Sequence, residues 1–221
     1  MKSTIVTGYV RIPDHPRSAD EYHRLAANLR RVGAPTRTFM SEVGRCWLST
    51  FVRDKTITHA VDDNPRKNTL DYHIVQHQKT AWLATAAEFG PAADVLVWMD
   101  YGIFHQPGIT VDVIDEFLRR IEAADKIDEI CIPGAWERSS GYADSPDWRF
   151  CGSSMIMPRA HARTFHEAVK DVTLSRLAAT NHVTWEVNDW AVVESLKVLP
   201  IRWYKADHNQ TQFTNWRHRV A

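Results

Sequence analysis

Asp100 is the side chain whose position points most directly to chemistry. It follows at once on the apolar run VLVWM at residues 95–99, and such a run is typical of a strand buried on both faces. Open α/β sheets bind ligands at the carboxyl ends of their strands. Mg²⁺ and Mn²⁺ prefer oxygen ligands and are often shared between one or two carboxylates and substrate phosphates. Asp100 is therefore a candidate metal ligand, and the alternative is that it caps a turn with Gly102.

Lys79 and Arg66 are the candidate positive charges for a diphosphate. Lys79 lies four residues from both Val75 and Leu83 on a helix predicted over residues 70–89, so it sits on or beside the apolar face of that helix. A lysine there either extends its ammonium to the surface or points it at an anion. Arg66 comes just before the same helix and offers a second cation.

Glu186 and Asp189 are a pair of carboxylates at the start of a second predicted helix, residues 185–197. They are three residues apart and share one helix face, so the two groups could act together in catalysis. Acidic residues are also favoured at a helix N-terminus by the helix dipole. The pair is therefore either a catalytic site or a complement to the dipole.

His208 and the Gly152–Ser153 stretch complete the set of candidate residues. His208 follows the last predicted strand, and histidine is the commonest metal-ligating side chain, although a histidine in a polar loop is often only exposed. Gly152 and Ser153 follow Phe150, and small residues allow a ligand to approach the backbone closely. A plain tight turn would explain them equally well.

The elements that must position these residues alternate between strands and helices. Hydrophobic patterning predicts strands at residues 3–12, 47–52, 95–99, 129–133, 150–157 and 201–205, and helices at 18–32, 70–89, 111–124, 160–172 and 185–197. This alternation predicts an α/β fold whose central sheet is mostly parallel and is flanked by helices on both faces. The sequence has no internal repeat and no linker, so residues 1–221 are expected to form a single domain.

The composition excludes several classes of protein. Lysine plus arginine equals aspartate plus glutamate at 27 each, so no overall field attracts nucleic acid or an anionic membrane. No run of 18 apolar residues is present, which predicts that the chain has no membrane span. The first residues lack the apolar core of a signal peptide. The three widely spaced cysteines fit a reducing cytoplasm.

The order of these parts resembles the GT-A fold of glycosyltransferases. The segment Trp98, Met99, Asp100, Tyr101, Gly102, Ile103 is similar to the Trp-Ile-Asp-Ala-Gly-Ile-like strand end of a bacterial family of glycosyltransferases linked to lipopolysaccharide genes. A more distant resemblance is to glycogenin and the lipopolysaccharide galactosyltransferases. The likeness covers roughly residues 3–216 in the order of elements, but only three short motifs are specific.

The resemblance implies a role for most of the candidate residues. Thr7, Gly8 and Tyr9 would line the nucleotide base and ribose, Lys79 would lie near the diphosphate, Asp100 and His208 would bind the metal, Gly152 and Ser153 would face the donor sugar, Asp189 would contact the transferred sugar, and Trp216 would close the site. One departure concerns Trp98, which stands where many relatives carry the first acid of an Asp-x-Asp motif.

The resemblance also implies an activity. We expect transfer of a sugar from a nucleotide-diphosphate sugar, with a UDP-sugar favoured, to a glycan, lipid-linked, protein or nucleic-acid acceptor, assisted by Mn²⁺ or Mg²⁺. Asp189 or Glu186 would stabilise positive charge at the sugar, or would act as base if the reaction inverts the sugar. The alternatives are a metal-dependent nucleotide-sugar hydrolase or nucleotidyltransferase, and a catalytically degenerate protein that binds a sugar or nucleotide.

Overall fold

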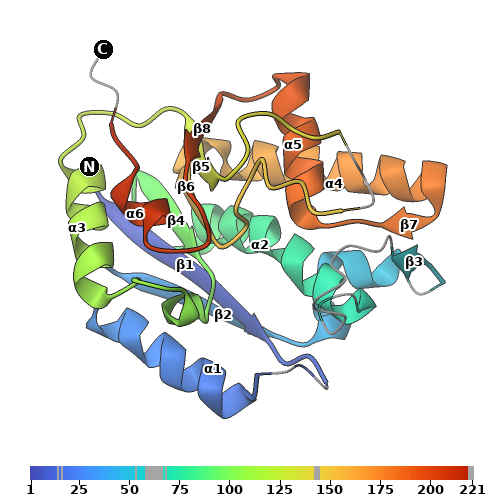
Figure 1. Ribbon diagram of the computed structural model, residues 1–221, viewed down its shortest axis with the longest axis horizontal. Coiled ribbons are helices and arrows are strands. Elements are labelled where there is room, and N and C mark those ends of the chain that lie inside the picture. The colour runs from blue at the N-terminus through green and yellow to red at the C-terminus, as the bar shows by residue number, and fades with distance from the viewer. Residues whose placement is uncertain are drawn as a thin grey trace.

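A six-stranded sheet forms the centre of the protein in the computed structural model, which describes residues 1–13, 15, 17–52, 54–57, 67, 69–141 and 145–218. The strand order is β2-β1-β4-β6-β5-β8 (Figure 1). These strands are β1 (Ser3–Val10), β2 (Thr36–Ser41), β4 (Val95–Met99), β5 (Ile130–Gly134), β6 (Ser154–Pro158) and β8 (Ile201–Lys205). Within this sheet β6 runs antiparallel to both of its neighbours, and the other paired strands are parallel. The predicted α/β fold with a mostly parallel sheet is confirmed.

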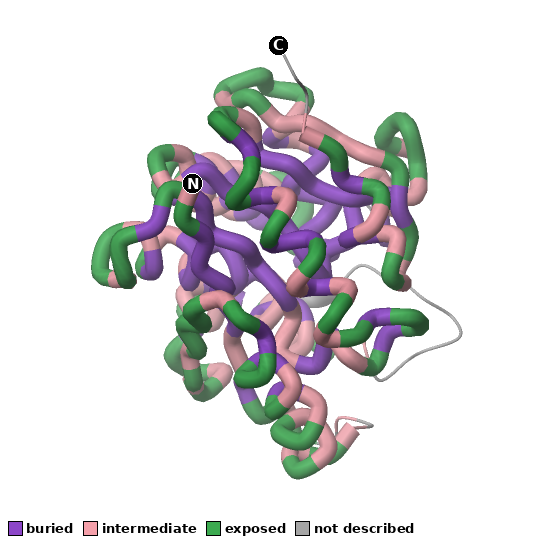
Figure 2. Tube along the Cα trace, turned by 90° about the vertical axis from the view of Figure 1, so that its left-hand side faces the viewer, coloured by how far each residue is buried: buried purple, intermediate pink, exposed green. Residues whose placement is uncertain are grey.

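Helices cover both faces of the sheet and bury two separate hydrophobic cores. The helices are α1 (Ala19–Ala26), α2 (Leu70–Phe89), α3 (Val111–Glu122), α4 (Ala162–Thr180), α5 (Glu186–Leu196) and α6 (Thr211–Thr214). One core joins the sheet to α2, α4 and α5, and the other joins it to α3 and α6. Side chains of a strand alternate between the two faces of a sheet, so Ile5 lies in one core and the adjacent Val6 in the other. Figure 2 shows the buried strands enclosed by more exposed segments.

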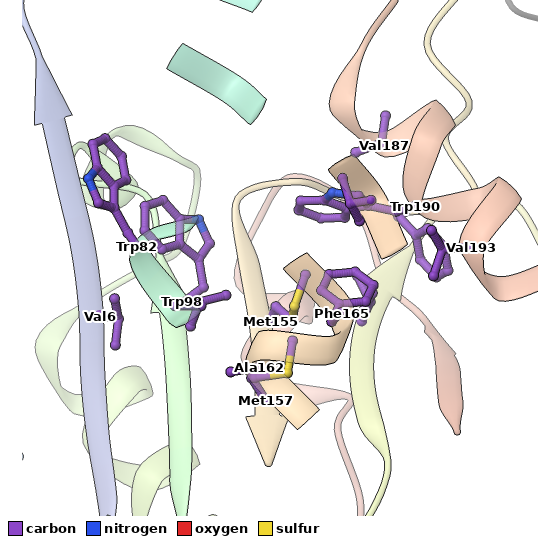
Figure 3. Close-up of a cluster of buried hydrophobic side chains, with 14 of the residues drawn as sticks. Val6, Trp82, Trp98, Met155, Met157, Ala162, Phe165, Val187, Trp190 and Val193 are labelled. Carbon is purple, nitrogen blue, oxygen red and sulfur yellow. The ribbon is translucent and has the colours of Figure 1, made fainter. Parts of the chain in front are cut away.

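A close approach between α2 and β1 requires a glycine. Trp82 of α2 stacks on Trp98 of β4, with ring centroids 5.8 Å apart and planes tilted by 14°, and both rings lie beside Val6 (Figure 3). A Cβ atom on Gly8 would lie 2.2 Å from the Trp82 ring, which is well inside van der Waals contact. Gly8 therefore allows α2 to pack directly over the end of β1, where a ligand would bind.

The ends of α2 and β4 agree with the sequence-based expectation because both carry strong local signals. Thr69 caps α2 by accepting a hydrogen bond from the backbone N–H of Tyr72, and the helix stops at Gly90. All five residues of β4 are buried. Each element is thus determined by its own residues, and together they place Lys79 and Asp100 at the same edge of the sheet.

Residues 47–52 were expected to form a strand, and that expectation is wrong. Trp47–Thr50 is a 3₁₀ helix, because the Trp47 indole donates to the carbonyl of His77 and its backbone N–H donates to Gln78, both on α2. The edge strand is instead β2, which the sequence analysis missed. Its residues are mostly exposed and largely polar, so they lack the apolar pattern that predicts a strand.

Three smaller elements also differ from expectation. The predicted helix 18–32 ends at Ala26 and continues as the 3₁₀ helix Ala27–Arg31. Two short strands, β3 (Thr56–Ile57) and β7 (His182–Val183), form a second, parallel pair.

Within the described part of the chain, none of the helices combines the length and the apolar character that crossing a lipid bilayer would take.

Candidate functional site

A cleft of about 960 Å³ opens at the carboxyl ends of β1 and β4. Eight of the candidate residues line it, namely Gly8, Tyr9, Lys79, Asp100, Gly152, Ser153, Glu186 and His208. They come from segments far apart in the sequence, and the sheet brings them together at the edge where open α/β folds bind ligands. Because β6 is antiparallel to β4, its first residues lie beside Asp100, whose backbone N–H donates to the carbonyl of Ser153 at 2.9 Å.

Lys79 lies at the centre of a buried ion cluster on the cleft floor. Its Nζ lies 2.9 Å from Glu186 Oε1, 2.9 Å from the carbonyl oxygen of Gly152 and 3.3 Å from Asp100 Oδ1. An ammonium group has three N–H donors, so these three acceptors match its full capacity. Lys79 thereby joins α2, the strand end of β4 and the first residue of α5.

Each charge in this cluster stabilises the ionised form of its neighbour. Burial alone would lower the pKa of Lys79, but the carboxylates of Asp100 and Glu186 outweigh it and raise that pKa above its usual value. Burial alone would raise the pKa of Glu186, but the neighbouring Lys79 ammonium lowers it. Both groups are therefore ionised at neutral pH. Two carboxylates and one ammonium give the cluster a formal charge of −1.

Asp100 is the member of the cluster that the cleft exposes. Its side chain is 31% exposed, against 5% for Lys79 and 3% for Glu186. The indole N–H of Trp98 donates to Asp100 Oδ1 at 3.0 Å. The Trp98 indole thereby orients the Asp100 carboxylate. This hydrogen bond spans only two residues, but the sequence pattern alone did not reveal it.

His208 borders the cleft beside Trp148, whose ring lies 4.9 Å away in an edge-to-face arrangement. Burial lowers the pKa of His208 below its usual value, so the imidazole is neutral at pH 7 and can ligate a metal. No group of three or more histidine, cysteine or acidic side chains is placed to hold a metal ion among the residues that the structure describes. Asp100 and His208 both line the cleft, and a metal ion held by either would need further ligands from elsewhere.

Asp189 does not line the cleft, although it shares a helix face with Glu186. It is fully buried, and its oxygens accept from Thr173 Oγ1 at 2.7 Å, from Arg176 Nε at 2.9 Å and from His77 Nε2 at 3.2 Å. Thr173 and Arg176 belong to α4 and His77 to α2. Asp189 therefore holds α5 against α2 and α4. This position stabilises the fold and gives no contact with a substrate in the cleft.

The remaining candidates also lie away from the cleft or outside the described residues. Trp216 is buried against Phe117 in the core under α3, with ring centroids 5.9 Å apart. Thr7 is buried within β1, and its hydroxyl has no partner among the described residues. Arg66 lies outside the residues that the structure describes. Neither Thr7 nor Trp216 lines the cleft.

An aromatic and basic group at the end of β1 was missed by the sequence analysis except for Tyr9. The Tyr9 ring lies 5.6 Å from Tyr22, 5.0 Å from His23 and 5.1 Å from Tyr101. Arg17 stacks over Tyr22 at 5.3 Å, and Arg11 also lines the cleft. Flat rings beside cations suit a base carrying phosphates. The sequence could have indicated this group, because Arg11, His15 and Arg17 come directly after the opening strand.

Comparison with known proteins supports the fold assignment. No protein-family profile matches the chain, and no curated protein sequence matches it. Among solved structures, the chain is similar to a glycosyltransferase involved in the glycosylation of the major capsid of PBCV-1, with a TM-score of 0.55 and 11% sequence identity over 94% of this chain and 82% of that chain. At this identity the similarity shows a glycosyltransferase-like fold.

Proposed function

We propose that this protein is a glycosyltransferase that moves a sugar from a nucleotide-diphosphate sugar, with a UDP-sugar favoured, to the hydroxyl group of an acceptor. The observation that carries the proposal is the Lys79–Asp100–Glu186 cluster on the cleft floor, at the strand ends of a glycosyltransferase-like fold. The base and ribose would bind beside Gly8 and Tyr9, and the donor sugar would lie against Gly152 and Ser153. The diphosphate would lie near Asp100.

A divalent cation, Mn²⁺ or Mg²⁺, fits the residues present. A carboxylate and a neutral imidazole, Asp100 and His208, are suitable donors, and such cations commonly take their remaining ligands from substrate phosphates and water. The formal charge of −1 on the cluster also attracts a cation and would repel an unaccompanied diphosphate. When bound, the cation would neutralise charge that builds up on the departing diphosphate.

Glu186 is the carboxylate that we assign to the sugar. Lys79 holds its Oε1, while its Oε2 has no hydrogen-bond partner among the described residues. In the reaction the bond from the anomeric carbon to the acceptor oxygen forms and the bond to the phosphate oxygen breaks, and the nucleoside diphosphate leaves with the electron pair. Glu186 stabilises the positive charge that develops on the sugar. In an inverting reaction it also takes the hydroxyl proton, whereas in a retaining one the leaving phosphate takes it.

Release of nucleoside diphosphate tests the proposal. Purified protein is incubated with UDP-, GDP-, CDP- and ADP-sugars, with and without Mn²⁺ and with a mixture of acceptors. We expect release from one donor class, stimulated by Mn²⁺ and by acceptor, and a loss of at least about 100-fold in Asp100→Asn. Asp125→Asn, which alters an exposed carboxylate, is the matched control. Release that never depends on an acceptor would indicate a hydrolase, and no release from any donor would refute the proposal.

A further inference from the structure

The wall of the cleft beside Glu186 is built of aromatic rings that the proposed donor site does not use. Trp148 and Trp185 lie with ring centroids 6.3 Å apart and planes tilted by 57°, and Tyr72 packs against Trp185 at 5.5 Å. All three residues line the cleft. We propose that Trp148 and Trp185 form the acceptor subsite and that the acceptor is an uncharged glycan. This inference rests on the proposed function and adds the substrate class of its second substrate.

Two unpartnered polar atoms accompany the rings. Trp185 is buried and lines the cleft, yet its indole N–H has no hydrogen-bond partner among the described residues. Glu186, the next residue, has the unpartnered Oε2. Leaving a buried donor or acceptor unsatisfied is costly. A sugar that reached these two atoms would satisfy both, because each hydroxyl donates one hydrogen bond and accepts others, while the apolar faces of its ring would pack on indole.

The distribution of charge in the cleft argues for an uncharged acceptor. Among the described residues that line the cleft, the segments that carry Trp148 and Trp185 contribute one charged side chain, the carboxylate of Glu186. Arg149 lies next to Trp148, but its Nε and Nη2 donate to Glu194 at 2.8 and 2.6 Å, and its Nη1 donates to the carbonyl of Glu137. Nucleic acids are bound largely through lysine and arginine side chains that contact their phosphates, and a phosphate-linked lipid carries the same kind of charge. Arg11, Arg17 and Lys67 offer such cations, but the arginines come from the loop after β1 and Lys67 from the segment before α2, not from the segments that carry the tryptophans.

The wall of the cleft that Trp148 and Trp185 form, here called the tryptophan wall, is held in place by hydrogen bonds. Asn188 of α5 accepts from the backbone N–H of Asp147 at 2.7 Å and donates to the carbonyl of Ser145 at 2.8 Å. The carbonyl of Trp148 accepts from the backbone N–H groups of Ala135 and Trp136, each at 2.9 Å. Because α5 begins directly after Trp185 and carries Asn188, one helix positions both rings and Glu186. A preformed platform loses little entropy when it binds a sugar.

The test uses Trp148→Ala, with Trp136→Ala as the matched control because Trp136 is 40% exposed and does not line the cleft. The probes are p-nitrophenyl glycosides as neutral acceptors and an oligonucleotide and a phosphopeptide as charged ones. We expect wild type to use a neutral glycoside, and Trp148→Ala to raise its KM at least about tenfold while UDP still binds in the presence of Mn²⁺. Trp185→Phe, which keeps a ring but removes the N–H, should raise KM less. Trp136→Ala should match wild type.

Two results would overturn the inference. One is an unchanged glycoside KM in Trp148→Ala, and the other is a wild-type enzyme that transfers sugar only to the charged acceptors. Saturation-transfer NMR of the glycosides on wild type and Trp148→Ala supplies a second readout that needs no turnover. Failure of the proposed function is distinguishable, because wild type would then release no nucleoside diphosphate from any donor.

Discussion

Two buried ion clusters join α2 to α5, and they differ in how fully their carboxylates are satisfied. At the cleft floor, Glu186 pairs with Lys79 through Oε1 and leaves Oε2 without a partner among the described residues. One helical turn later, Asp189 faces His77 and also accepts from Thr173 and Arg176, so that both of its oxygens are engaged. The two acids therefore share a helix, burial and a cationic neighbour, but only one retains bonding capacity.

Burial and charge are therefore not sufficient to identify a catalytic acid. A buried carboxylate with every oxygen bonded has nothing left to offer a substrate, and removing it mainly costs stability. A buried carboxylate with an open oxygen, at the floor of a cleft, is suited to charge that appears only during reaction. Substitutions of Glu186 and Asp189 should separate these two roles.

The largest effect is expected at Glu186. Glu186→Gln removes the negative charge but keeps an oxygen that accepts from Lys79, so kcat/KM should fall by about 10³-fold. Because Asp100 still pairs with Lys79 at 3.3 Å, the Tm should fall less than in Asp189→Asn. Nucleoside diphosphate release and thermal unfolding measure the two quantities. Glu88→Gln, at an exposed position of α2, is the matched control. Wild-type turnover by Glu186→Gln would contradict the assignment.

Asp189 should show the opposite pattern. Asp189→Asn leaves Arg176 and His77 facing a neutral amide, so the free energy of unfolding should fall by about 3 kcal/mol, the usual cost of breaking a buried pair. Urea denaturation measures this loss. The kcat/KM of the folded fraction should stay within about tenfold of wild type, since Asp189 does not line the cleft. Normal stability combined with a loss of activity as large as that of Glu186→Gln would reverse the two assignments.

His73 extends the comparison to acid stability, because it lies on α2 one turn before His77 and packs edge-to-face on Trp185 at 5.3 Å. Burial, with a contribution from His77, lowers the pKa of His73 from 6.5 to about 4. Between these values the unfolded chain binds the proton and the folded one does not, so stability falls as the pH drops from 6.5 to 4. Replacing it by phenylalanine should remove about 2–3 kcal/mol of that dependence. Equal slopes of unfolding free energy against pH in the variant and wild type would contradict this prediction.

Much of the fold could be predicted from local signals, and the failures have a physical cause. Helix 70–89 has a capping threonine and a terminal glycine, and strand 95–99 is apolar throughout, so their bounds follow from their own residues. Strand β2 carries few apolar residues because it lies at the exposed edge of the sheet. Residues 47–52 look like a strand, but Trp47 gains its hydrogen bonds from α2, a partner that no local pattern reveals.

The candidate site, like the fold, has parts that could be predicted from the sequence and parts that could not. The strand-end position of Asp100 and the helical spacing of Lys79 were visible, and the structure brings both to the cleft floor. Glu186 and Asp189 could not be told apart, because both are acidic and both lie on the same helix face. What separates them is Thr173 and Arg176 on α4. The tryptophan wall depends likewise on the bonds that Asn188 makes with the chain before Trp148.

The most direct test of a metal–diphosphate site in this cleft is a thermal-shift measurement on wild type and Asp100→Asn. The ligands are UDP, GDP, CDP and ADP, each with and without Mn²⁺. A ligand that binds only the folded protein raises its Tm. We expect a shift with one nucleotide, UDP favoured, that grows when Mn²⁺ is added and disappears in Asp100→Asn. Absence of a shift with every nucleotide, with or without Mn²⁺, would contradict a metal–diphosphate site in this cleft and the glycosyltransferase function that rests on it.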